Sequence, residues 1–155
     1  MFNILKNFLS EIKSFFFTLN ILIELKKIKP KFVFYSEKKS YQKYSEPIID
    51  VLNSQFPDQV YYFSSDKTDK FKNKNVKNFY INNLFLNTFF NQVKTENMFL
   101  TLTDLGNHFI KKTKNIDKYI YYFHSPVSTT KNFTAKAFDN YDIIMCNGQF
   151  QIEEI

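Results

Sequence analysis

Short runs of β-branched and aromatic residues alternate with helix-forming segments along most of this chain. Such alternation is typical of α/β folds, in which each helix carries the chain back to begin the next parallel strand. We therefore expect an α/β fold with a doubly wound, mostly parallel, Rossmann-like sheet and right-handed crossovers. The expected strands cover residues 32–35, 59–63, 77–81, 97–102, 119–123 and 142–146, and the expected helices cover residues 41–56, 84–91, 108–112, 131–138 and 149–155.

A single α/β domain accounts for most of the 155 residues. A chain of this length buries roughly two-thirds of its unfolded surface, and here 20 Phe and 10 Tyr without any Trp must fill much of the core. Lys29, Pro30 and Lys31 mark where the domain begins, because proline disfavours helix in the residue before it. We expect an amphipathic amino-terminal helix over residues 1–28 and the Rossmann-like domain over residues 29–155.

The first segment carries an apolar stripe at helical spacing, with lysines at positions 6, 13, 26 and 27 beside or opposite it. Its continuous apolar part is far shorter than the ~20 residues that cross a bilayer, and no cleavage site of a signal peptide follows. Two readings remain. Residues 1–27 lie in a membrane interface, or the stripe packs on the domain or on a partner, which we favour. The stripe consists of Leu5, Phe8, Ile12, Phe15, Phe16, Leu19 and Ile23.

The net charge of +6 comes from 21 Lys and no Arg. Sequence-specific DNA-binding proteins rely on the planar guanidinium of arginine, which forms two hydrogen bonds to a base. A chain without arginine is therefore not expected to have nucleic acid as a partner. Lysine suits attraction to phosphate or to anionic lipid, although AT-rich coding drift explains the same composition. The single cysteine, Cys146, excludes an internal disulfide and a Cys-cluster zinc site. It fits a reduced, cytoplasmic setting.

His124 is the main candidate for chemistry. Five β-prone residues lead into it, and Pro126 cannot continue a ladder, so His124 should lie at the carboxyl end of a buried strand. In open α/β sheets ligands bind outside the carboxyl ends of the strands. An imidazole there can accept a proton from an attacking hydroxyl. The alternative is a histidine that merely hydrogen-bonds the next loop.

Other polar residues follow the expected strands and should gather at the same edge of the sheet. Asp104 could instead cap a helix, and Asp66 could form a turn. His108 is expected at the surface or in helix packing, and two histidines without a third nearby ligand predict no metal site. The edge residues are Glu37, Ser64, Ser65, Asp66, Asp104, Asn107 and Ser128.

Several collinear blocks between residues 30 and 155 resemble the amino-terminal half of the CDP-glycerol glycerophosphotransferase family of teichoic-acid polymerase-like enzymes. The blocks read FVFYSEKKSYQKYSEPIIDVL, VYYFSSDKTD, LTLTDLGNHFIKKTKN and YIYYFHSPVSTTKNFTAKAFDNYDIIMCNGQFQIEEI. The resemblance implies the first lobe of a GT-B-type fold, which mainly builds the acceptor side of an active site between two lobes. It leaves the first helix unexplained.

The family transfers a polyol phosphate from a CDP-activated donor to an acceptor hydroxyl in cell-surface polymer synthesis, with no separate cofactor. By resemblance His124 would be the general base, although the family's His-Gly pair reads His124-Ser125 here. Ser125, Ser128 and Thr129 would hydrogen-bond the acceptor or phosphate, and Glu37, Asp104 and Asn107 are the further substrate-binding candidates.

The resemblance places the second lobe beyond residue 155, so we expect this half to be inactive alone. We expect it in the cytoplasm, with peripheral contact to the inner face of the membrane through residues 1–27. Two alternatives stay open: half of a GT-B nucleotide-sugar glycosyltransferase, and a non-catalytic membrane-docking or binding domain.

Overall fold

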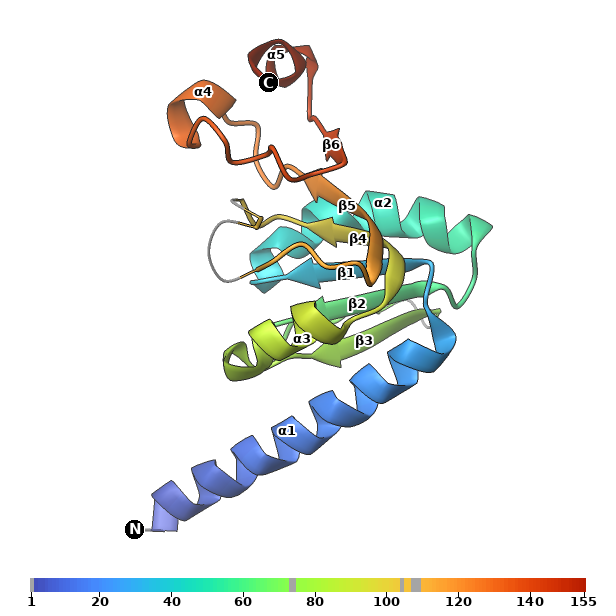
Figure 1. Ribbon diagram of the computed structural model, residues 1–155, viewed down its shortest axis with the longest axis vertical. Helices are drawn as coiled ribbons and strands as arrows, with labels where there is room; N and C mark the ends of the chain where they lie inside the picture. Colours follow the sequence, from blue (N-terminus) through green and yellow to red (C-terminus); the bar gives the residue numbers. More distant parts are fainter. Residues whose placement is uncertain (1, 73–74, 104, 107–109) are drawn as a thin grey trace.

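The computed structural model describes residues 2–72, 75–103, 105–106 and 110–155, with α1 side chains described at 5, 9, 10, 12, 13 and from 15 onward. It confirms the α/β class, because six parallel strands form one open sheet in the order β3-β2-β1-β4-β5-β6 (Figure 1). This is the doubly wound order of Rossmann-like folds. The strands are β1 Phe32–Ser36, β2 Val60–Ser64, β3 Val76–Tyr80, β4 Thr95–Leu100, β5 Ile116–Tyr122 and β6 Ile143–Met145.

Helices lie on both faces of the sheet (Figure 1). Right-handed crossovers place the β1-to-β2 and β2-to-β3 connections on one face and the connections after β3 on the other. Accordingly α2 covers the first face, whereas α3 and the carboxyl half of α1 cover the second. The helices are α1 Phe2–Ile28, α2 Gln42–Gln55, α3 Leu86–Gln92, α4 Thr129–Asn132 and α5 Gln149–Glu154, with short 3₁₀ turns η1 Lys39–Tyr41 and η2 Asn83–Phe85.

Strands β1 and β2 are buried along their whole length, as expected for the centre of a parallel sheet covered on both faces. Alternate side chains enter two aromatic cores. On the α2 face, the rings of Phe34 and Phe99 stack with their centroids 4.2 Å apart. On the other face, Tyr35 packs its ring edge against Phe90, at 5.1 Å. The aromatic content of the sequence is therefore used mainly for packing.

The carboxyl half of α1 belongs to the domain core. Ile21, Leu22 and Leu25 are buried in the cluster that also contains Phe89 and Phe90 of α3. The helix ends where Lys29 adopts a φ of +44° and its amide donates to the Leu25 carbonyl at 2.9 Å, an αL cap. This half of the helix does pack on the domain, but through a face other than the predicted stripe, whose described residues are exposed.

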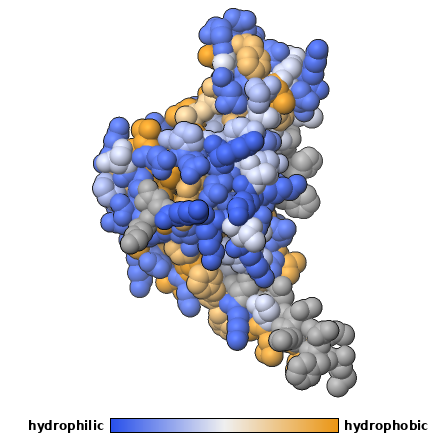
Figure 2. All heavy atoms as spheres, turned by 180° about the vertical axis from the view of Figure 1, so that it is seen from behind, coloured by the Kyte–Doolittle hydropathy of each residue, from blue (hydrophilic) through white to orange (hydrophobic). Residues whose placement is uncertain are grey.

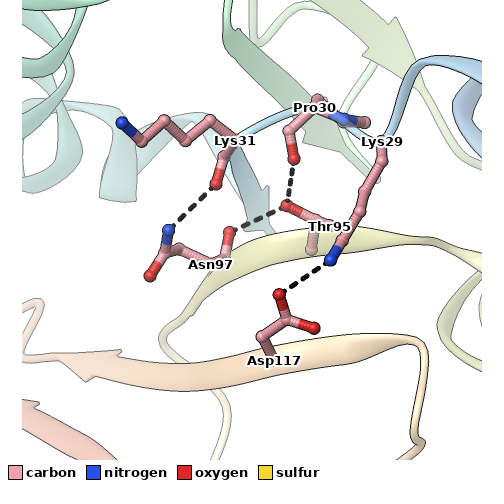
Figure 3. Close-up of polar contacts among 6 residues, drawn as sticks. All are labelled: Lys29, Pro30, Lys31, Thr95, Asn97 and Asp117. Carbon is pink, nitrogen blue, oxygen red and sulfur yellow. Dashed lines mark hydrogen bonds and ion pairs between the residues drawn. The ribbon is translucent and has the colours of Figure 1, made fainter.

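The junction between α1 and β1 is tied to the neighbouring strands (Figure 3). The Thr95 hydroxyl donates to the Pro30 carbonyl at 2.8 Å, and the Asn97 side-chain amide donates to the Lys31 carbonyl at 3.1 Å. Lys29 forms an ion pair with Asp117 of β5 at 2.8 Å. These contacts fix the direction in which α1 leaves the sheet.

Two expected helices are wrong in extent. The helix expected over 131–138 is only α4, because Phe133 takes an extended conformation (φ −127°, ψ 156°) and packs its ring against Phe123 and Phe138. In the helix expected over 108–112, the described residues 110–112 are not helical. There the Gly106 amide, at a φ of +87°, donates to the Ile110 carbonyl at 2.6 Å.

One part of the α2 face of the sheet lacks a covering helix among the described residues. A groove of about 510 Å³ runs there between α2 and the edge strand β6. Its lining is almost entirely apolar and consists of Pro47, Ile48, Val51, Leu52, Phe99, Ile120, Ile143 and Met145.

Candidate functional site

The order of the strands creates a switch point between β1 and β4, which are neighbours in the sheet. The chain leaves β1 toward β2 but leaves β4 toward β5, so the two connections diverge at the carboxyl edge. Ligands of doubly wound proteins bind in the crevice that this divergence opens. The residues that follow β1 and β4 therefore carry the first functional expectation.

A pocket of about 440 Å³ opens at this edge, over the carboxyl ends of β1, β2 and β4. Glu37, Lys38 and Ser65 supply polar groups from the loops after β1 and β2, and Asn83 and Asn87 supply amides from the segment after β3. The floor and remaining wall are apolar, from Tyr35, Leu84, Leu86, Leu102 and Ile110. A few converging polar groups over an apolar floor are typical of sites for small ligands.

Glu37 is the titratable centre of this pocket. Its side chain is half-buried, and burial raises its pKa above the ordinary value, with Lys38 opposing the rise. The neighbouring Tyr35 hydroxyl shares a 2.8 Å hydrogen bond with Ser65, and burial raises the pKa of Tyr35 to about 12. A carboxyl group beside hydroxyls and amides can hydrogen-bond the hydroxyls of a polar ligand.

His124 lies two residues beyond β5, at the same edge of the sheet, where the sequence predicted it. Its ring packs against Tyr41 of η1, with the centroids 4.3 Å apart. Burial lowers the pKa of His124, so the neutral imidazole predominates near pH 7. Nδ1 is sealed from solvent and has no hydrogen-bond partner among the described residues.

Further buried polar atoms near this edge lack a partner in the described part of the chain. Among them are the hydroxyl oxygens of Thr101, directly after β4, and of Tyr121 and Tyr122, at the end of β5. The pKa of Tyr121 is raised by burial and then by its proximity to Glu37 and Tyr41. Tyr121 is therefore near both Glu37 and Tyr41, although neither Tyr121 nor His124 lines the Glu37 pocket.

Ser125, Ser128 and Thr129 have other partners. The Ser128 hydroxyl donates to Glu154 Oε1 at 3.0 Å, and the Thr129 amide and hydroxyl donate to Glu154 Oε2 at 2.5 and 2.9 Å. These hydrogen bonds lower the pKa of Glu154. The Ser125 carbonyl accepts from Gln151 at 3.5 Å. Ser128 and Thr129 thus hold the carboxylate of α5 and do not line the Glu37 pocket.

Of the other residues predicted at this edge, some belong to the described part of the chain and some do not. Asp104, Asn107 and His108 lie outside the described residues. Asp66 forms a turn, accepting from the Thr68 amide at 2.9 Å, as the alternative reading held. Within the described ranges, no three His, Cys, Asp or Glu side chains could together hold a metal ion.

The sequence missed two features of this edge. Asp69, in the polar segment between β2 and β3, is buried and accepts hydrogen bonds from the Tyr62 and Ser64 hydroxyls, both at 2.8 Å. Asn83 and Asn87 were not expected in the pocket. Their spacing of four residues on one side of a short helix was the available signal.

Comparison with known proteins does not identify a family for this chain. The chain matches no family model, no curated protein and no solved structure, so its function is argued from this edge of the sheet.

Proposed function

We propose that this chain is the acceptor-side domain of a CDP-glycerol glycerophosphotransferase-like enzyme and that His124 is its general base. The observation that carries the proposal is the state of His124. Its imidazole lies at the carboxyl edge beside the switch point, has a lowered pKa, and keeps a buried Nδ1 without a partner among the described residues. Perturbed titratable groups in such a place mark functional sites more often than packing does.

The pocket supports an acceptor that carries several hydroxyl groups. Glu37, Ser65 and the amides of Asn83 and Asn87 offer both donors and acceptors within one cavity of about 440 Å³. The apolar floor suits the carbon backbone of a polyol or sugar. Lys38 adds a positive charge at the rim, which attracts an anionic polyol phosphate.

In the reaction, the acceptor hydroxyl attacks the phosphorus atom that carries the polyol. A new P–O bond forms, the P–O bond to CMP breaks, and CMP leaves with the bonding electron pair. Nε2 of His124 accepts the proton of the acceptor hydroxyl, which requires a neutral ring, and burial favours that form near pH 7.

The enzymatic test measures polyol phosphate transfer by the complete gene product, with CDP-glycerol as donor and a glycerol-phosphate oligomer as acceptor. We expect His124→Ala to lower kcat by about 10²- to 10⁴-fold, the usual contribution of a general base. The control is Lys131→Ala, an exposed residue of α4, which should retain the activity of the unmodified protein.

A loss of only a few-fold in His124→Ala would remove the base role. Activity with a UDP-sugar in place of CDP-glycerol would reassign the domain to a nucleotide-sugar transferase. The choice of donor distinguishes these two enzymes, because His124 would matter in both.

A further inference from the structure

Helix α1 carries a second apolar face that the domain does not cover. Its packing face consists of Thr18, Ile21, Leu22 and Leu25, which are all buried. On a helical wheel the second face lies about 150° away from the first, at 100° per residue. It consists of Leu5, Leu9, Ile12, Phe16, Leu19 and Ile23, which are 36–62% exposed, and we refer to it as the seam. In Figure 2, α1 forms the lower end of the molecule, and apolar side chains are visible on it.

The seam has the spacing of a coiled coil. Its members are separated alternately by four and three residues from Leu5 to Ile23, which is the a/d pattern of a heptad repeat. Lys13 and Asn20 directly follow two of its members and limit the apolar width there, whereas exposed Phe15 and Phe17 flank the seam at Phe16. An a/d stripe is the spacing of helix pairing, and a surface-lying helix usually shows a broader apolar arc.

The order of the seam residues is symmetric about position 14. If two copies of α1 run antiparallel, Leu5 meets Ile23, Leu9 meets Leu19, and Ile12 meets Phe16 of the other copy. In each pair the two residue numbers sum to 28, and each pair joins an a to a d position. A twofold dimer requires the same surface on both copies to be complementary to itself, and the seam meets this requirement.

The position of α1 allows two copies to pair in this way, and the exposure of its amino-terminal half gives a physical reason for pairing. The half of α1 before Thr18 extends away from the sheet (Figure 1), and a helix without packing is marginal in water. Antiparallel pairing lays this half against the carboxyl half of the other copy, whose domain contacts a different face. With roughly 200 Å² for a large apolar side chain, covering the seam in both copies removes on the order of 1,000 Å² from water, the lower limit of specific interfaces.

We propose that the chain forms a twofold dimer through an antiparallel coiled coil of α1, with the seam as its interface. No helix in the described part of the chain is both long and apolar enough to cross a membrane. A second copy of α1 covers the seam with a matching register.

The first test is sedimentation equilibrium of the whole chain. We expect a mass near twice 18.7 kDa, and we expect Leu9→Glu to reduce it to that of one chain. The matched control is Phe17→Glu, because Phe17 and Leu9 are both 51% exposed on the same helix, but Phe17 lies about 120° from the seam. A single-chain mass for the unmodified protein, or equal effects of the two variants, would overturn the proposal.

The second test fixes the direction of the pair. In a Cys146→Ser background, mixed Leu9→Cys and Leu19→Cys chains should cross-link to each other, while each variant alone should cross-link weakly. Efficient cross-linking within each variant alone would contradict the antiparallel order.

Salt separates this dimer from docking on an anionic lipid surface. Antiparallel pairing brings the Lys13 side chains of both copies near the twofold axis, so screening their repulsion with salt should strengthen the dimer. Attraction to anionic vesicles weakens with salt. A monomer that binds phosphatidylserine vesicles at low salt and loses binding in Leu9→Glu would assign the seam to lipid and contradict the dimer.

Discussion

Several buried polar atoms of the described residues lack a hydrogen-bond partner, both at the carboxyl edge of the sheet and away from it, as at Asn53 and Thr113. Buried polar atoms usually find a hydrogen-bond partner. Thr101, Tyr121 and His124 each keep one that has none among the described residues, and Glu37 has a pKa raised by burial. Proteins tolerate such destabilised groups where function requires them. Under the proposed function, a ligand supplies hydrogen bonds to those at the carboxyl edge.

Replacing Glu37 should therefore stabilise the chain near neutral pH. Because its folded-state pKa lies above the unfolded value, the folded chain binds the proton more tightly, and stability falls as pH rises through that window. We expect Glu37→Gln to raise the free energy of unfolding at pH 7 by about 1 kcal/mol or less, since solvent still reaches the carboxyl, and to have little effect at pH 3.5.

Urea denaturation of Glu37→Gln at the two pH values measures this. The control is Glu153→Gln, an exposed acid on α5. A Glu37→Gln variant that is less stable at pH 7 would show that the carboxylate makes a favourable contact in the folded chain.

The sequence identified the positions of His124 and Glu37 because strand ends are readable from hydrophobic runs and a proline. It could not identify Tyr121, since a tyrosine inside an apolar strand gives no sign of an unpartnered hydroxyl. It also assigned Ser128 and Thr129 to a ligand. Their partner, Glu154, comes from a separate helix, and contacts between distant segments depend on packing that a local pattern does not contain.

At the scale of elements, strands were predicted more reliably than the short helices. Buried strands need continuous β-prone runs, and all six lie near their expected positions. By contrast α4 stops after four residues because the Phe133 ring packs into the core. Tertiary contact thus overrides local helix preference where a helix is short.

The junction between α1 and the sheet provides an element-scale prediction. Thr95 is fully buried, and its hydroxyl donates to the Pro30 carbonyl at 2.8 Å. Thr95→Val keeps the shape but leaves that buried carbonyl without this donor, so the free energy of unfolding should fall by about 1–3 kcal/mol.

Chemical denaturation monitored by tyrosine fluorescence measures the loss. Thr88→Val, at an exposed position on α3, makes the same change of side chain and should cost less than about 0.5 kcal/mol. Equal losses in the two variants would mean that the junction bond contributes nothing beyond the change of residue type.

At the scale of the molecule, the fold class followed from the alternation of strands and helices, but the order of the strands did not. That order places β1 beside β4 and so creates the switch point on which the functional proposal depends. The sequence also did not predict the uncovered groove between α2 and β6. Its residues form normal core patterns, and only the three-dimensional arrangement leaves them without a covering helix among the described elements.

The central claim is that the His124 ring at the carboxyl edge faces a ligand, and proton NMR of its C2–H tests this most directly. The chain has two histidines, so comparison with His124→Gln assigns the resonance. We expect a titration midpoint below 6.5, from the pKa lowered by burial, and a shift of this resonance when a glycerol-phosphate oligomer is added. A midpoint at or above 6.5, together with a resonance unmoved by saturating oligomer, would contradict the account.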